Sequence, residues 1–326
     1  SKPRVVDDMI LVTGGTGDVG KELVLRLAER SEVLAFDIAP NPSKLSAQGK
    51  IRIQRGNVLN LSEVLGAIRE NSSETVIHLA SMLTSDCEAR PFEAVSVNML
   101  GVATVLEACR LAGCVKRFVF ASTSSVYGAT GGRGIIDENF PKDPMNIYGA
   151  LKYGSELYCR NYGKKYGIEY VACRLRVIFG PGQRHDTGAM KILRISDLLA
   201  DIMNGRDSIF VGSPEDKLEV THPKDAAKAL ALAAHVRPLG SDAYNIMTGS
   251  YTFAEIAKAF QGAVPGSNIN FDPLNGKKPV SGGPSTNFGI YDISRSRKEL
   301  GYEPEYTIEK IVSEIVEYQR LRKQVA

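Results

Sequence analysis

The sequence lacks the motifs that would bring cysteines or histidines together around a metal. Its five cysteines are scattered, odd in number and never spaced C-x-x-C, and its four histidines show no ligand spacing. A metal site is therefore not expected. Scattered cysteines without a pairing pattern are typical of reduced, packed thiols, and no signal peptide opens the chain. These observations predict a cytoplasmic protein.

The sequence also lacks an excess of one charge and a long apolar run. Its 40 basic residues face 37 acidic ones, which leaves a net charge of +3. With no basic run and no interleaved aromatic residues, this balance argues against a nucleic-acid partner. No apolar run approaches the roughly 20 residues of a membrane span, so we expect no membrane partner. A length of 326 residues, 43% of them hydrophobic, allows one substantial domain and a smaller appended one.

What the sequence does contain begins with a glycine-rich stretch at residues 9–20. A short apolar run indicates a buried parallel strand, and Gly14, Gly17 and Gly20 then follow with the spacing G-x-x-G-x-x-G. An amphipathic run over residues 21–30 indicates a helix. Strand, glycine turn and helix in this order can present backbone N–H groups to a phosphate. By itself, the stretch fits a helix-capping turn of small residues equally well.

The next apolar run, residues 32–37, predicts a second strand that ends in Asp37. An acid at this offset after the glycine turn is placed to bind the hydroxyls of an adenosine ribose. The alternative is a solvated turn acid before Pro40, but the strand end favours the ribose. No arginine follows directly to accept a 2′-phosphate, so the sequence favours NAD over NADP.

Strand and helix patterns alternate through the first half of the chain. This alternation predicts an α/β fold with a doubly wound parallel sheet and right-handed crossovers. Expected strands are 51–55, 75–80, 117–122 and 170–175, and expected helices are 61–70, 91–112 and 147–166. Later helices are expected at 191–203, 223–234, 253–260 (capped by Thr252) and 308–321 (capped by Thr307), and a strand at 244–247 could rejoin the sheet.

Reactive side chains fall where the fifth strand ends and the second long helix begins. Tyr148 and Lys152 lie one helical turn apart, so they share a face. A lysine charge nearby favours the phenolate and lowers the pKa of a tyrosine, which then exchanges a proton near neutral pH. The hydroxyl of Thr123 could orient the same reacting oxygen. The spacing alone is not specific, because Tyr306 and Lys310 share it, and the pair could be a helix face without a role.

Taken together, these segments resemble the extended short-chain dehydrogenase/reductases, which include the NAD-dependent epimerases and dehydratases of nucleotide sugars. The resemblance rests on the glycine turn, on His78-Leu79-Ala80, on residues 122–128, on Tyr148-x-x-x-Lys152, on Gly180-Pro181-Gly182 and on residues 291–304. It covers nearly the whole chain. It implies an NAD-binding Rossmann domain (1–176 plus about 220–248) and a smaller C-terminal substrate lobe (177–219 plus 249–326).

The resemblance also implies a role for individual residues. Tyr148 would be the acid/base, Lys152 would tune it and hold the nicotinamide ribose, and Thr123 would bind the reacting oxygen. The implied NAD contacts are Gly14, Gly17, Asp18, Val19, Gly20, Asp37, Ile38, Asn57, Val58, Leu79, Ala80, Ser81, Asn98, Ser122, Tyr148, Lys152 and Val177. The implied substrate contacts are Met82, Thr123, Ser124, Ser125, Tyr148 and Arg184. We expect the carboxylate of Asp18 to face away from the cofactor phosphates.

Departures from the family pattern reduce the number of reactions that fit the sequence. Ser124 and Ser125 stand where sugar dehydratases carry an acidic pair, which argues against elimination of water. Val177 replaces an asparagine that touches nucleotide sugars, and Leu218 replaces an arginine that grips their diphosphate, with Lys217 beside it. A lysine does not reproduce the bidentate arginine contact.

Three functions follow from this pattern. The favoured one is NAD-dependent oxidation of a secondary alcohol in a sugar, sugar acid or similar hydroxylated molecule. The alternatives are a nucleotide-sugar 4-epimerase with tightly bound NAD and a non-catalytic NAD-sensing protein. The resemblance further suggests a homodimer formed through the two long helices.

Overall fold

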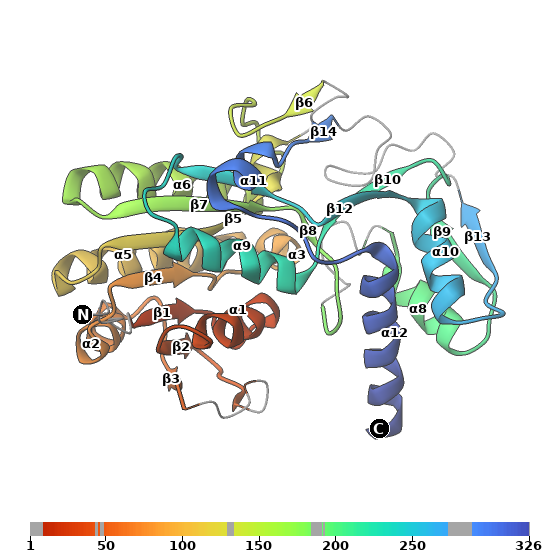
Figure 1. Ribbon diagram of the computed structural model, residues 1–326, viewed down its shortest axis with the longest axis horizontal. Coiled ribbons are helices and arrows are strands. Elements are labelled where there is room, and N and C mark those ends of the chain that lie inside the picture. Colours follow the sequence, from red (N-terminus) through yellow and green to blue (C-terminus); the bar gives the residue numbers. More distant parts are fainter. Residues whose placement is uncertain are drawn as a thin grey trace, which may run out of the picture.

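A seven-stranded parallel sheet organises the molecule (Figure 1). The computed structural model describes residues 9–42, 45, 49–128, 134–183, 191, 193–272 and 289–325. The strand order is β11-β7-β5-β4-β1-β2-β3. The strands are β1 (Ile10–Thr13), β2 (Val33–Asp37), β3 (Ile51–Arg55), β4 (Thr75–His78), β5 (Arg117–Thr123), β7 (Glu169–Leu175) and β11 (Ala243–Ile246). The predicted doubly wound sheet is confirmed, and the late strand rejoins it by parallel pairing with β7.

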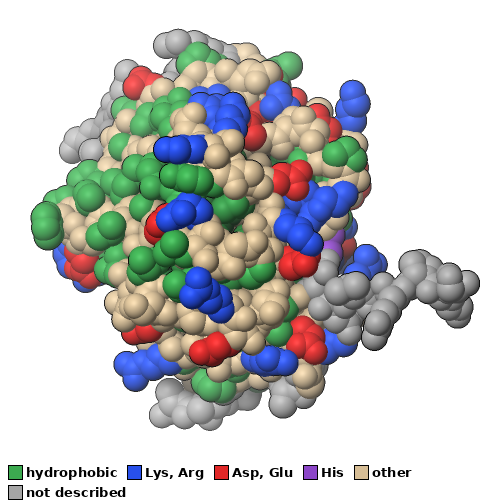
Figure 2. All heavy atoms as spheres, turned by 90° about the vertical axis from the view of Figure 1, so that its left-hand side faces the viewer, with side chains coloured by type: hydrophobic (Ala, Val, Ile, Leu, Met, Phe, Trp, Pro, Cys, Tyr) green, Lys and Arg blue, Asp and Glu red, His purple; other side chains and the backbone are tan. Residues whose placement is uncertain are grey.

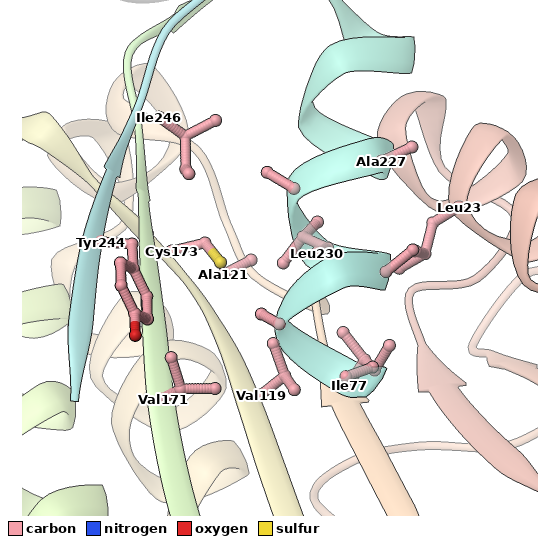
Figure 3. Packing of buried hydrophobic residues seen from close by; sticks show 14 of the residues in the cluster. Leu23, Ile77, Val119, Ala121, Val171, Cys173, Ala227, Leu230, Tyr244 and Ile246 are labelled. Carbon is pink, nitrogen blue, oxygen red and sulfur yellow. The ribbon is translucent and has the colours of Figure 1, made fainter. Parts of the chain in front are cut away.

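Helices cover both faces of this sheet, which explains why its central strands are apolar throughout. On one face, α1 (Asp18–Ala28) packs against α9 (Pro223–His235). Figure 3 shows Leu230 of α9 between Leu23 of α1 and the strand residues Val119 and Cys173. On the other face, α2 (Leu61–Asn71), α5 (Gly101–Ala112) and α6 (Ile147–Tyr166) bury apolar side chains against the sheet.

The helix expected at residues 91–112 forms, but its interior differs from the prediction. It consists of α4 (Pro91–Val95), the π-helical turn η2 (Ser96–Leu100) and α5, and Gly101 does not break it. By length and composition this helix could cross a membrane, although 44% of the apolar window is buried inside the molecule. Charged residues interrupt the segment, so it is not one continuous apolar run, and the absence of a membrane partner stays a prediction.

The C-terminal half adds small sheets and a second apolar core. One sheet joins β12 (Gly249–Thr252), β10 (Lys217–Thr221) and β8 (Val177–Ile178), and another joins β13 (Ile269–Asp272) and β9 (Ser208–Val211). Around them pack α8 (Ile195–Met203), α10 (Phe253–Ala263) and α12 (Ile308–Val325). Helix α8 begins later than predicted because Arg194 lies in the left-handed region, at φ 52°. The division into two domains stays a prediction.

Shorter elements connect the two halves. They are α3 (Thr84–Ala89), the 3₁₀ turn η3 (Ser124–Tyr127), α11 (Ser294–Leu300), and the paired strands β6 (Ile135–Ile136) and β14 (Ile290–Tyr291). The predicted cap Thr252 forms a complete capping box with Glu255. Thr307 accepts a 3.5 Å hydrogen bond from the backbone N–H of Lys310 at the start of α12.

Candidate active site and cofactor site

The glycine turn between β1 and α1 packs closely on its inner side. Gly14 has φ +68°, and a Cβ there would lie 2.9 Å from the backbone nitrogen of Ala80. A Cβ on Gly20 would overlap the carbonyl oxygen of Gly14. Gly17 is exposed, begins α1 without a side-chain cap, and a Cβ on it would approach only Gly14. The turn therefore has room beside Gly17, where the N-terminus of α1 has no side-chain cap. Such a place suits a phosphate-bearing cofactor.

Asp37 is tied to the glycine turn and is not a free turn acid. Its Oδ2 accepts hydrogen bonds from the backbone N–H (3.1 Å) and the hydroxyl (2.8 Å) of Thr16. Its Oδ1 accepts one from the N–H of Ala39 at 3.2 Å. The carboxylate therefore has a fixed position at the carboxyl end of β2. The sequence analysis did not single out Thr16, although it lies inside the glycine motif.

Two predicted asparagines make contacts within the protein. The Oδ1 of Asn57 accepts from the N–H of Leu59 at 2.9 Å. Asn98, in the π-helical turn, is 1% exposed. Its Oδ1 accepts from the N–H of Met82 (2.7 Å), and its Nδ2 donates to the carbonyl of Met82 (3.0 Å). Asn98 thus fixes the segment that follows β4, where the predicted contacts Leu79, Ala80 and Ser81 lie. Its contact with the cofactor itself stays a prediction.

Thr123, Tyr148 and Lys152 come together at the carboxyl edge of the sheet. Thr123 ends β5, and its hydroxyl donates to the Ser125 hydroxyl at 3.2 Å. Tyr148 lies in the first turn of α6, near enough for the Thr123 hydroxyl to lower the pKa of its phenol. The cap Asn146 accepts from the N–H of Gly149 at 2.7 Å and so fixes that turn. Lys152 is buried, donates to the carbonyl of Ala121 at 2.9 Å, and lies 5.8 Å from the centre of the Tyr148 ring.

Burial governs the titration of both residues. It raises the pKa of Tyr148 well above its usual value, and the nearby Thr123 hydroxyl offsets this only in part. The pKa of Tyr148 is therefore raised in the protein alone, against the expectation that it is lowered, because desolvation of the phenol dominates. Burial also lowers the pKa of Lys152 to about 8. A positive charge bound beside the phenol would shift the pKa of Tyr148 back down.

A sealed polar network lies behind this group. Glu156, one turn after Lys152, accepts hydrogen bonds from Ser122 and from Arg174 at 2.7–3.2 Å. Arg174 also donates to the hydroxyl of Tyr127 (2.9 Å) and to the carbonyl of Glu138 (3.0 Å). The predicted cofactor contact Ser122 is therefore anchored to α6 through Glu156.

Several other residues singled out from the sequence lie in different surroundings. Ser125 donates its N–H to Thr123 Oγ1 (3.1 Å), and the Ser124 hydroxyl accepts from Arg176 at 3.1 Å. Val177 pairs with Val220 in a neighbouring small sheet. Leu218, which stands at the family's diphosphate-binding arginine position, is 5% exposed and packs in the second apolar core. Arg184 lies outside the described residues. Among the described residues, no group of His, Cys, Asp and Glu could hold a metal ion.

The fold and this edge define a class of protein: an enzyme that binds a dinucleotide across the carboxyl ends of a doubly wound sheet. The chain belongs to the NAD dependent epimerase/dehydratase family, whose sequence pattern matches residues 10–246. NAD is therefore its cofactor, and the glycine turn and Asp37 fit that group.

Known relatives differ in the reactions for which they are named. A UDP-glucose 4-epimerase of Mycolicibacterium smegmatis is 27% identical over 325 residues, covering 96% of this chain and 99% of that protein. The structure of a UDP-glucose 4-epimerase of Thermotoga maritima with UDP-glucose has a TM-score of 0.80 and 23% identity, covering 98% and 100%. The holo form of an L-threonine dehydrogenase of Cupriavidus necator has a TM-score of 0.79 and 24% identity, covering 95% and 99%. At these identities the two structures establish the fold alone.

Proposed function

We propose that the protein is a dehydrogenase that oxidises a secondary alcohol with NAD, using Tyr148 as its acid/base. The observation that carries the proposal is the placement of the Tyr148 phenol near the Thr123 hydroxyl, one helical turn from the buried Lys152. A substrate hydroxyl placed between the two oxygens would be oriented by Thr123 and would give its proton to Tyr148. NAD supplies the hydride chemistry by accepting the hydrogen of the alcohol carbon with its electron pair.

The titration of the site supports proton exchange through Lys152. A lysine with a pKa of about 8 carries its proton at neutral pH and releases it in mildly alkaline solution. Tyr148 keeps its proton in the protein alone, because burial raises its pKa. We infer that Tyr148 becomes an effective base only when the cofactor and substrate are bound, and that Lys152 holds the nicotinamide ribose there. Activity is then expected to rise with pH through the mildly alkaline range.

The burial of Leu218 supports a dehydrogenase over an epimerase. An arginine at this position would be needed to hold a diphosphate, but the side chain here packs between apolar neighbours. Proteins named as UDP-glucose 4-epimerases among the relatives support the alternative, a nucleotide-sugar 4-epimerase that keeps its NAD. A non-catalytic NAD-sensing protein is a third possibility. The substrate we infer is a sugar, a sugar acid or a similar small hydroxylated molecule.

A screen of NAD reduction separates these functions. Purified protein is mixed with NAD and a panel of sugars, sugar acids, hydroxy acids and UDP-sugars, and NADH is followed by absorbance. Net NADH formation is the expected result. If the protein retains NAD through gel filtration and interconverts UDP-sugars without net NADH, it is an epimerase. If no compound is converted and Tyr148→Phe changes no measured property, the sensing function replaces the proposal.

We also propose that the protein is a homodimer. Exposed apolar side chains lie along the long helices, including Phe92 at 88% and Leu100 at 56% exposure on α4 and η2, and Tyr158 on α6. Figure 2 shows hydrophobic side chains gathered on one side of the molecule. Val102 and Leu106 face inward and are buried, so the exposed residues would form the contact. Light scattering that gives the mass of a single chain would contradict this proposal.

A further inference from the structure

An arginine lies beside Asp37 at the carboxyl edge of the sheet. Asp37 is the last residue of β2, Arg55 is the last residue of β3, and the two are direct partners in the parallel sheet. The backbone N–H of Gly56 donates to the carbonyl of Asp37 at 2.9 Å and fixes this register. Partners on neighbouring strands point to the same face, so the two side chains leave the sheet together.

Most of the Arg55 guanidinium is not bound by the protein. Its Nε donates to the carbonyl of Ile38 at 3.2 Å, which holds the side chain beside the residue that follows Asp37. Within the described residues, no carboxylate pairs with this guanidinium and no further hydrogen bond reaches it. Asp37 itself accepts from Thr16 and Ala39, not from Arg55. The two terminal nitrogens of Arg55 can therefore donate to a ligand.

Arg52, three residues earlier on the same strand, has different surroundings. Its Nη1 donates to Oδ1 of Asn71 at 2.9 Å, and its Nη2 donates to Oε2 of Glu32 at 3.1 Å. Both arginines are exposed. Because side chains alternate along a strand, Arg52 points to the face opposite that of Arg55. The guanidinium of Arg52 thus joins surface elements, whereas that of Arg55 lies next to the predicted ribose-binding carboxylate.

The chemistry of Arg55 suits a phosphate at this position. The planar donors of a guanidinium match two phosphate oxygens at once. At the end of the second strand of a dinucleotide-binding sheet, a bound dinucleotide presents the 2′ position of its adenosine ribose. NAD carries a hydroxyl there, and NADP carries a phosphate. Asp37 can accept a hydrogen bond from the hydroxyl, and Arg55 is placed to bind the phosphate.

We propose that Arg55 forms a binding site for the 2′-phosphate of NADP, so that the protein binds NADP in addition to NAD. The hydrogen bonds from Thr16 and Ala39 spread the charge of the Asp37 carboxylate, and the Arg55 guanidinium offsets its repulsion of a phosphate. NADP binds more weakly than NAD, because Asp37 is an anion beside that phosphate. The inference concerns binding of the dinucleotide, so it does not depend on whether the protein is a dehydrogenase, an epimerase or a sensing protein.

Titration with NADH and NADPH tests the inference, because the fluorescence of each reduced dinucleotide reports its binding without turnover. The protein is first freed of bound dinucleotide with charcoal. Unaltered protein is expected to bind both, NADPH more weakly. Arg55→Gln is expected to weaken NADPH binding about 10- to 100-fold and NADH binding less than about 2-fold, since NADPH alone loses a charged hydrogen-bond partner.

Two further variants and the salt dependence separate the phosphate contact from a general effect on the fold. Arg55→Lys keeps the positive charge but not the planar donors, so it is expected to recover part of the NADPH affinity. Arg52→Gln, the matched control on the same strand, should leave both affinities unchanged. Added sodium chloride should weaken NADPH binding more than NADH binding, because salt screens an exposed charge contact.

Three results would overturn the inference. The first is that unaltered protein shows no saturable binding of NADPH. The second is an equal loss of NADH and NADPH affinity in Arg55→Gln, which would place Arg55 against a group that both dinucleotides share. The third is that Arg55→Gln changes neither affinity. Each of these leaves the dehydrogenase function standing, because net NADH formation is measured separately, and a failure of NAD reduction in the screen would leave the NADPH titration unchanged.

Discussion

Two arginine–glutamate pairs lie close together in this fold, and they differ in how completely they are enclosed. Arg174 and Glu156 are each 6% exposed, and hydrogen bonds from several elements surround them. Arg176 and Glu219 are more open and line a pocket beside the proposed catalytic group. The two arginines are separated by one residue. The comparison teaches that the surroundings of a charge, more than its type or its place in the chain, determine how strongly the fold depends on its partner.

The largest expected effect is on the rate of catalysis. It comes from a substitution that leaves both arginine–glutamate pairs unchanged. Replacing Tyr148 by Phe removes only the hydroxyl that would carry the proton. We expect the rate of NADH formation to fall about 10²- to 10⁴-fold, the range usual for a lost acid/base group. NAD affinity and the unfolding midpoint in urea should stay close to those of the unaltered protein. A variant that retains more than half the rate would contradict the assigned role.

The next effect tests the enclosed pair against the open pair. Glu156→Gln leaves the buried guanidinium of Arg174 without a counter-charge, which is expected to cost about 3–5 kcal/mol of unfolding free energy. The matched variant Glu219→Gln should cost less, because the Arg176 side chain is 17% exposed whereas that of Arg174 is 6% exposed and solvent can partly compensate its charge. Urea unfolding of both variants gives the two values. Equal losses of unfolding free energy in the two variants would show that the fold depends equally on both pairs.

Asp37 is a third carboxylate, and its replacement tests whether it binds the cofactor. It is held by Thr16 but remains half-buried at the end of β2, so a ligand can reach it. Asp37→Ala is expected to weaken NAD binding about 10- to 100-fold, because a charged acceptor for the ribose hydroxyls is lost. NADP should lose less, since its 2′-phosphate is repelled by the same carboxylate. An equal loss for both dinucleotides, measured by fluorescence titration, would contradict the ribose contact.

The last expected effect concerns a buried group without a charge. His78, stacked on Phe118 and Phe120, has its pKa lowered by burial from 6.5 to about 3. Between these pH values the unfolded chain binds a proton that the folded protein does not. Its contribution to stability is therefore complete above pH 6.5 and declines as the pH falls towards 3, by at most about 1.4 kcal/mol per pH unit.

His78→Gln isolates this contribution. His222, whose pKa is lowered to about 4, and the acidic groups still titrate in the variant, so only the difference from the unaltered protein counts. The unfolding free energy of the variant should fall less steeply with acid. Parallel pH profiles for the two proteins would show that His78 is not held neutral.

Local signals explain how much of the molecule could be predicted from the sequence. The glycine turn, Asp37 at its strand end and the Tyr148–Lys152 spacing are short-range patterns, and the structure places them at one edge of the predicted sheet. The pairs Arg174–Glu156 and Arg176–Glu219 join residues that are far apart in the chain, so no spacing in the sequence predicts them. The direction of the pKa shift at Tyr148 was missed for a related reason, since burial depends on packing from several elements.

The stoichiometry of NADH release tests the central claim most directly. Substrate consumed and NADH formed are measured together, with a hydroxylated substrate identified by the screen and an excess of NAD. The dehydrogenase account predicts one NADH released for each molecule of substrate converted, and a loss of both in Tyr148→Phe. Conversion of substrate without net NADH, by protein that carries its own NAD, would contradict it.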